Sequence, residues 1–267
     1  MAQGLQAPIK QKLMVNLVKE TFMELGEDFS ISNNLKTSKI NGVGRNSYIF
    51  DLDGVITDTT KFHYSAWAKA FKDLRDLIGK PGIKINENIY NNIIDGAPRC
   101  ETIKNILMLH GITFSNEDVA AIAYYKNKEY MSLVRKKGVF LYKDAIDLIK
   151  GLSQIGAKMG VATSSKNGHE ILKMARISHY FDFIASGEEI ECLKLKPKPS
   201  PDIFNLVIKK LGSDIEDVFI LEDSKVGLSS AIATGCKNVI YADRKNLNLN
   251  LGFRYRLTNL TDILNIA

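Results

Sequence analysis

The chain has 267 residues, of which 45% are hydrophobic and 25% charged, so we expect a globular protein with one large domain and a smaller one. Its formal charge is +6, but Lys and Arg are spread along the chain without a basic block, so we expect no nucleic-acid partner. No apolar run reaches membrane-spanning length, no signal peptide is recognisable, and the three cysteines lie far apart, so we expect a cytoplasmic location and no membrane partner.

The first part of the chain carries no motif of its own. Between residues 14 and 25 the apolar side chains fall at helical spacing, and Gly26 is a plausible stop signal. Residues 30–45 are rich in Ser, Asn, Lys and Gly, which is typical of a linker. We therefore predict that residues 1–46 form an N-terminal helical extension and linker.

A pair of aspartates follows the first predicted strand. The run Ser47-Tyr-Ile-Phe50 is β-branched and aromatic, and Asp51, Asp53 and Gly54 come directly after it. In open α/β sheets ligands bind beyond the carboxyl ends of the strands. Two carboxylates so close together repel each other unless they share a cation or a proton, so the pair predicts Mg²⁺ or a similar hard cation. A plain polar turn is the alternative, because Asp and Gly are common turn formers.

The remainder of the chain divides into two patterns. Residues 61–138 show helical spacing interrupted by Gly-containing turns and no strand-like alternation, which predicts an all-helical cap. From residue 139 strands and helices alternate, with strands expected at residues 159–163, 183–185, 218–221 and 239–241. The predicted fold class is α/β: a Rossmann-like, mostly parallel sheet formed by residues 47–60 and 139–267, with the helical cap domain inserted.

Three further polar clusters stand near predicted strand ends. Thr163-Ser-Ser-Lys-Asn167 supplies hydroxyl, ammonium and amide groups for phosphoryl oxygens, although a helix N-cap loop explains it equally well. Lys198-Pro-Ser-Pro-Asp202 offers a lysine that can neutralise a phosphoryl group, although a lone lysine is usually solvated. Glu222 and Asp223 end a buried run, where uncompensated charge is costly, so a metal would account for them.

Taken in order, these clusters resemble the haloacid-dehalogenase superfamily over residues 47 to about 243. The resemblance implies that Asp51 is a nucleophile forming an aspartyl phosphate and that Asp53 is the general acid and base. It implies a Mg²⁺ site made by Asp51, the main-chain oxygen of Asp53 and Asp223, with Glu222 as a further ligand or as a support behind the ligands.

Within the superfamily the chain is most similar to the β-phosphoglucomutase branch, through His63, Trp67, Gly96 and Arg99. This similarity implies a larger set of substrate- and phosphate-binding residues: Thr59, His63, Gly96, Arg99, Lys126, Thr163, Ser165, Lys166, Asn167 and Lys198. In that set Thr163 and Lys198 bind the transferring phosphoryl group. Arg99, a residue of the cap, binds the distal phosphate of the substrate. A surface salt bridge for Arg99 and a plain helix-surface position for His63 remain the alternatives.

The branch implies an isomerase that interconverts β-D-glucose 1-phosphate and glucose 6-phosphate through a 1,6-bisphosphate, acting as a monomer on a small sugar phosphate. Closure of the cap excludes water, which would otherwise hydrolyse the aspartyl phosphate. Asp95 and Pro98 depart from the lysine and serine typical of the branch, so a Mg²⁺-dependent sugar-phosphate phosphatase stays open as the alternative. A non-catalytic binding protein is disfavoured, because every catalytic position is filled.

Overall fold

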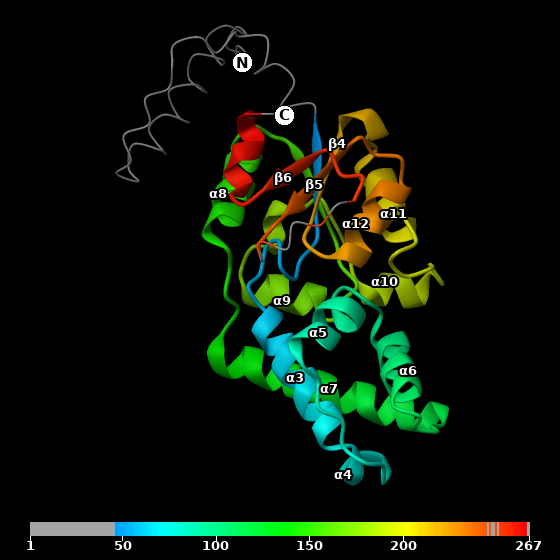
Figure 1. The fold of residues 1–267 in the computed structure, drawn as a ribbon. Helices are drawn as coiled ribbons and strands as arrows, with labels where there is room; N and C mark the ends of the chain where they lie inside the picture. Colours follow the sequence, from blue (N-terminus) through cyan, green and yellow to red (C-terminus); the bar gives the residue numbers. More distant parts are fainter. Residues whose placement is uncertain (1–45, 245, 247–248, 250, 266–267) are drawn as a thin grey trace, which may run out of the picture.

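The computed structural model describes residues 46–265 apart from 245, 247, 248 and 250. The predicted helix at residues 14–25 and the linker at residues 30–45 lie outside the described residues. The described chain forms a six-stranded sheet in the order β3-β2-β1-β4-β5-β6, and every pairing is parallel (Figure 1). The strands are β1 (Ser47–Phe50), β2 (Lys158–Ala162), β3 (Phe183–Ala185), β4 (Val218–Glu222), β5 (Asn238–Ala242) and β6 (Tyr255–Leu257).

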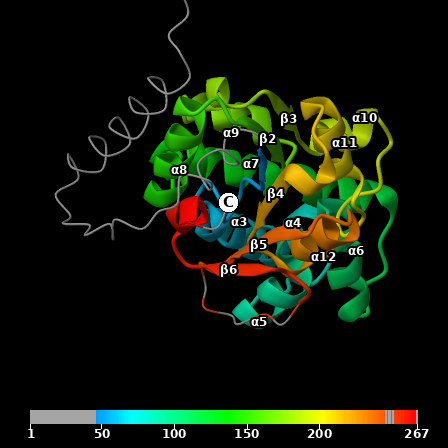
Figure 2. The ribbon, with the colours of Figure 1, turned by 90° about the horizontal axis from the view of Figure 1, so that it is seen from above.

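Helices cover both faces of the sheet because side chains alternate along the buried strands. In β1, Tyr48 and Phe50 enter one core, whereas Ile49 enters the core on the opposite face. The first face is covered by α8 (Lys143–Gln154), α9 (Gly168–Met174) and the 3-10 helix at Leu260–Asn265. The second is covered by α11 (Asp202–Leu211) and α12 (Lys225–Ala233), with α10 (Gly187–Cys192) beside β3 (Figure 2).

The strand order places a topological switch point at the centre of the sheet. From β1 the chain continues to β2 and β3 on one side, then crosses back to β4 on the other side of β1. Loops leaving β1 and β4 therefore diverge, and they open a crevice at the carboxyl ends of these strands. Asp51 and Glu222 stand at this crevice, at the ends of the two strands that flank the switch point.

The cap lies beyond that edge of the sheet (Figure 1). Its helices are α3 (Thr60–Lys72), α4 (Leu74–Ile78), α5 (Glu87–Ile89), a π-helical turn at Tyr90–Ile94, α6 (Arg99–Leu109) and α7 (Asn116–Lys137), and no strand occurs among them. A separate hydrophobic cluster that includes Trp67, Phe71 and Ile106 holds these helices together. The inserted all-helical cap is thus confirmed.

Two short stretches connect the core to the cap, and they pair with each other. The Asp58 amide donates to the Phe140 carbonyl at 2.9 Å, and the Tyr142 amide donates to the Ile56 carbonyl at 3.0 Å. An isolated antiparallel bridge joins Thr57 to Leu141 between these bonds. The outgoing and returning connections, which form the hinge, are therefore tied to each other at the base of the cap.

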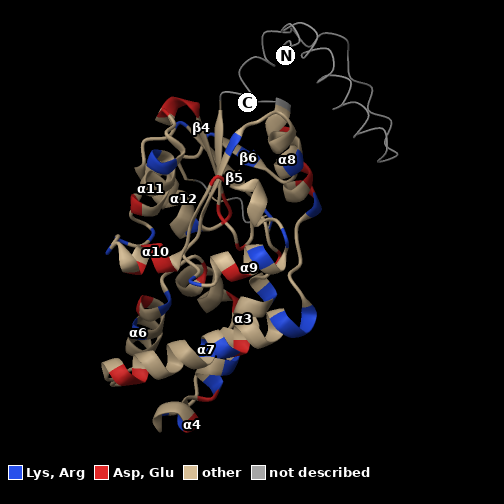
Figure 3. Cartoon of the chain, turned by 180° about the vertical axis from the view of Figure 1, so that it is seen from behind, with Lys and Arg blue, Asp and Glu red and all other residues tan. Residues whose placement is uncertain are grey.

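The predicted strands are confirmed within one residue at each boundary, and the sheet is fully parallel rather than mostly so. The edge strand β6 was not predicted, because the short Tyr-Arg-Leu run has a charged centre and no apolar alternation. Acidic and basic residues are interspersed over the core and the cap (Figure 3). Among the described residues, no helix combines the length and the apolar character that crossing a membrane requires.

Candidate active site

Most of the residues predicted from the sequence line one pocket between the core and the cap. The pocket-lining members of that set are Asp51, Asp53, His63, Gly96, Arg99, Lys126, Thr163, Ser165, Lys198, Glu222 and Asp223. Thr59 lies behind the wall, against Asp53. Lys166 points away and pairs with Glu191 at 2.6 Å on the surface, and Asn167 is buried beside the pocket.

Lys198 holds the two strand-end loops together at the bottom of the pocket. Its ammonium donates to Asp51 Oδ1 and to Glu222 Oε1, each at 2.7 Å, and to the Ala162 carbonyl at 3.1 Å. Burial raises the pKa of Asp51, the neighbouring Glu222 adds to the rise, and Lys198 opposes it. Burial alone would lower the pKa of Lys198, but the two carboxylates outweigh burial and raise it. One ammonium thus compensates two buried carboxylates.

Glu222 is fixed by donors at both of its oxygen atoms. While Oε1 accepts from Lys198, Oε2 accepts from the Ser224 amide at 2.9 Å and from the Ser224 hydroxyl at 3.1 Å. Gly227 makes this packing possible, because a Cβ there would lie 1.7 Å from Glu222 Oε1. Although Glu222 lines the pocket, its oxygen atoms are engaged by Lys198 and Ser224, so we expect it mainly to hold Lys198.

We expect Gly227→Ala to destabilise the protein by about 2 kcal/mol and to lower turnover, because the added methyl group displaces Glu222 and with it Lys198. Gly151→Ala is the matched control, since that glycine is also helical but has no atom within 4 Å of an added Cβ. The control is expected to gain up to about 1 kcal/mol. Urea unfolding and turnover of both variants test this, and equal stabilities would contradict it.

The donors for a metal are all oxygen atoms. Asp51 and Asp223 are both buried carboxylates that line the pocket, and Asp53 lines it as well. Gly54 follows Asp53 with φ +94°, and a Cβ there would lie 2.1 Å from Asp223 Oδ2. Among the described residues no group of three His, Cys, Asp or Glu side chains gathers for a metal. A metal held by the two carboxylates would complete its coordination with other oxygen atoms, such as the Asp53 carbonyl, water or substrate. This donor set fits Mg²⁺, which prefers oxygen.

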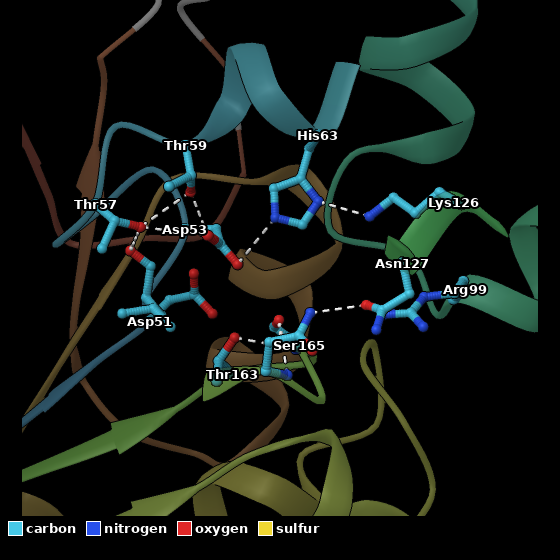
Figure 4. Close-up of polar contacts among 12 residues, drawn as sticks. Asp51, Asp53, Thr57, Thr59, His63, Arg99, Lys126, Asn127, Thr163 and Ser165 are labelled. Atoms are coloured by element: carbon cyan, nitrogen blue, oxygen red, sulfur yellow. Dashed lines mark hydrogen bonds and ion pairs between the residues drawn. The ribbon is translucent and has the colours of Figure 1, made fainter. Parts of the chain in front are cut away.

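Asp53 is oriented by hydroxyls from its own loop and by the cap. Its Oδ1 accepts hydrogen bonds from Thr59 and, at 3.2 Å, from Thr57, and its Oδ2 lies 3.4 Å from His63 Nε2 (Figure 4). Burial raises the pKa of Asp53, but His63, the Thr59 hydroxyl and Lys126 together lower it to about 2. In this arrangement Asp53 is a carboxylate, in the form that accepts a proton.

A buried lysine in the cap fixes the histidine. Lys126 Nζ lies 2.9 Å from His63 Nδ1 and also faces the rings of Trp67 and Tyr130 at 5.1 and 4.9 Å (Figure 4). Burial lowers the pKa of Lys126, and Arg99 lowers it further. One hydrogen bond thus joins Lys126 to Nδ1 of His63, and the other ring nitrogen, Nε2, faces Asp53.

Arg99 and Asn167 meet at an amide oxygen from a third element. Arg99 Nη2 donates to Asn127 Oδ1 at 3.0 Å, and Asn167 Nδ2 donates to the same oxygen at 2.8 Å (Figure 4). Burial lowers the pKa of the Arg99 guanidinium. On the core side, Thr163 Oγ1 accepts from the Ser165 amide at 3.1 Å and thereby shapes the loop below. A desolvated cation and an amide donor thus converge on one spot.

Several residues of the site were not predicted from the sequence. Thr57 and Asn127 contact predicted residues, and Tyr90, Ser164 and Ser224 line the pocket. Ser224 directly follows Glu222-Asp223, and Ser164 lies within the predicted Thr163-Ser-Ser-Lys-Asn167 cluster, so both were within reach of the sequence. Asn127 gave no signal, because a single polar residue on an amphipathic helix looks like solvated surface.

The parallel sheet, the carboxylates at its switch point and the helical cap define a capped α/β enzyme. The chain belongs to the haloacid dehalogenase-like hydrolase family, whose model matches residues 48–241.

Relatives within this family include both isomerases and phosphatases. The chain is 30% identical to a β-phosphoglucomutase of Bacillus subtilis, over 70% of this chain and 79% of that protein. It is 26% identical to a phosphorylated carbohydrates phosphatase of Thermotoga maritima, over 72% and 82% of the respective chains. The crystal structure of a β-phosphoglucomutase from Clostridium difficile superposes with a TM-score of 0.70 at 27% identity, covering 83% of this chain and 95% of that one.

Proposed function

We propose that this enzyme transfers phosphoryl groups of sugar phosphates with the aid of Mg²⁺, using Asp51 as nucleophile and Asp53 as general acid and base. The observation that carries the proposal is that the two aspartates have different hydrogen-bond partners. Asp51 is held by the Lys198 ammonium at the bottom of the pocket, whereas Asp53 is oriented by hydroxyls and by a histidine of the cap. One carboxylate is placed to attack and the other to exchange a proton.

Different residues of the chain carry out the separate steps of phosphoryl transfer. In the phosphorylated enzyme a sugar hydroxyl attacks the phosphorus of the aspartyl phosphate, the Asp51 carboxylate leaves, and Asp53 takes the proton of that hydroxyl. Asp51 Oδ then attacks the phosphorus of the other ester, and Asp53 gives the same proton to the ester oxygen that leaves. The low pKa of Asp53 makes the base form, with which this cycle begins, the resting one. Lys198 and Thr163 contact the phosphoryl oxygens. A Mg²⁺ held by Asp51, Asp223 and the main chain of Asp53 would neutralise phosphoryl charge.

For the substrate we propose β-D-glucose 1-phosphate, converted to glucose 6-phosphate through the 1,6-bisphosphate. Support comes from Arg99, a partly buried cation whose Nη2 donates to a neutral acceptor across the pocket from Asp51. A partly desolvated guanidinium that lines the same pocket as Asp51 favours a substrate that carries a second phosphate. The similarity to a β-phosphoglucomutase at 30% identity supports the same choice.

A sugar-phosphate phosphatase is the second candidate, and Asp95 favours it. This acid lines the same pocket beside Gly96, where its charge disfavours a second phosphate. In a phosphatase, water takes the place of the attacking sugar hydroxyl, and the steps at Asp51 are unchanged.

A coupled assay separates the two. With β-glucose 1-phosphate, Mg²⁺ and a trace of glucose 1,6-bisphosphate, we expect glucose 6-phosphate to form faster than inorganic phosphate. α-Glucose 1-phosphate, run in parallel, serves as the control for anomer preference. Stoichiometric phosphate release without glucose 6-phosphate would exclude the isomerase and leave the phosphatase.

A further inference from the structure

The bond between Asn127 and Asn167 crosses from the cap to the core. Asn127 lies on α7, in the same cap as Arg99 on α6, whereas Asn167 immediately precedes α9 in the core. If the cap moves as one body, the Arg99–Asn127 contact stays intact and the Asn127–Asn167 contact breaks. In the structure the same asparagine contacts both the cap arginine and the core.

The geometry at Asn127 Oδ1 resembles that of a bound anion. Two N–H donors, one from each side of the pocket, converge on this oxygen at 3.0 and 2.8 Å. A carbonyl oxygen has two lone pairs and satisfies both donors without carrying a charge. It stands in for a phosphate oxygen, and its neutrality leaves the positive charge of Arg99 available to a ligand.

A groove between α7 and α9 adds a second observation. Asn127 and Asn167 both line this groove, whereas Arg99 lines the pocket with Asp51. Farther along the groove Arg135 Nη2 pairs with Glu170 Oε1 at 3.1 Å, but both of those side chains are exposed. The Asn127–Asn167 bond is thus a partly buried link between cap and core on the α9 side.

We infer that Asn127 is a positioning residue, which keeps Arg99 aimed at the distal phosphate of the substrate and ties the cap to the core at Asn167. The inference rests on the proposed sugar-phosphate substrate and deepens it, because it assigns the neutral amide a role in phosphate affinity. A carboxylate of the same shape at this position would pair with Arg99 and compete with the phosphate.

The test measures binding of glucose 6-phosphate in the presence of Mg²⁺ by titration calorimetry, with Asp51→Asn in the background so that no turnover disturbs the heats. We expect Asn127→Ala to weaken binding about tenfold, the loss of a hydrogen bond to a charged group, and Asn127→Asp to weaken it more. Arg135→Ala is the control on the same helix and is expected to stay within about twofold, because its ion pair is exposed. Thermal unfolding of each variant establishes that it is folded.

The relative affinities of Asn127→Ala and Asn127→Asp for glucose 6-phosphate decide whether the inference holds. A merely structural asparagine would tolerate the isosteric Asp better than Ala, so tighter binding by Asn127→Asp than by Asn127→Ala would overturn the inference. Affinities of both variants equal to that of the parent would overturn it as well. If the parent binds glucose 6-phosphate and the variants follow the expected order, the inference stands even where the enzyme with Asp51 intact transfers no phosphoryl group, a result that would refute the proposed function alone.

Discussion

Asp51→Asn is expected to lower phosphoryl transfer by a factor on the order of 10⁴ or more, the loss typical of an enzyme without its nucleophile. The amide keeps the size and shape of the side chain, but its oxygen is far less nucleophilic and does not form the acyl phosphate. Steady-state turnover of the sugar phosphate, measured with Mg²⁺ present, checks the prediction. Residual turnover above about one hundredth of the parent value would contradict it.

The stability of Asp51→Asn is not expected to fall together with its activity. In the parent protein one ammonium compensates two buried carboxylates, and the pKa of Asp51 is raised above its ordinary value by burial and by Glu222. Replacing Asp51 by a neutral amide leaves Lys198 and Glu222 as a matched pair, so the free energy of unfolding is expected to be unchanged or higher by up to about 1 kcal/mol. Asp147→Asn, at an exposed pair with Lys143, is the control for charge removal without loss of activity.

Lys198→Met is expected to lose both activity and stability. The methionine fills the space but leaves Asp51 and Glu222 facing each other, with no cation at 2.7 Å from either. Breaking a buried ion pair from one side costs about 3 kcal/mol or more. Turnover is expected to fall by roughly 10³, because the phosphoryl group also loses a charged donor. Urea unfolding and turnover measure the two effects.

The stability loss of Lys198→Met is expected to depend on pH in a direction that the carboxylates fix. Burial and mutual repulsion raise the folded-state pKa of Asp51 already in the parent, and removal of the lysine raises it further. An acid whose pKa is higher in the folded state destabilises the fold above its unfolded-state pKa, and this penalty disappears as pH falls. The variant should therefore be closer to the parent at pH 5 than at pH 8. Lys143→Met, which removes an exposed pair, should show no such trend; a pH-independent loss in Lys198→Met would contradict the account.

The sequence was sufficient to predict which carboxylates gather in the pocket, because the signals are local. Asp51 and Asp223 follow apolar runs typical of buried parallel strands, and Asp53 lies two residues after Asp51, so the sheet predicts that they meet. The mutual arrangement of these strands follows from parallel βα connections, which leave few topologies. The confirmed strand boundaries reflect the same local signal.

Contacts between distant elements were beyond the reach of the sequence. Asn127 meets Asn167 across 40 positions, and no local pattern distinguishes it from a solvated helix residue. The exposed position of Lys166 is likewise set by a partner 25 positions away, Glu191, although its neighbours in the loop face the site. Glu222 and Asp223 have different surroundings, because Glu222 is held at both of its oxygen atoms. This difference depends on Gly227 and Lys198, which approach Glu222 only in the folded chain.

The measurement that bears most directly on the central claim is covalent labelling of Asp51. The protein is incubated with Mg²⁺ and radiolabelled acetyl phosphate, quenched in acid and digested, and the labelled peptide is identified by mass spectrometry. We predict a radiolabelled, acid-stable, alkali-labile phosphate on Asp51 whose label passes to the sugar when unlabelled sugar phosphate is added, and no label in Asp51→Asn. Turnover of a sugar phosphate by a protein that never carries this label, or that carries it on another residue, would contradict the account.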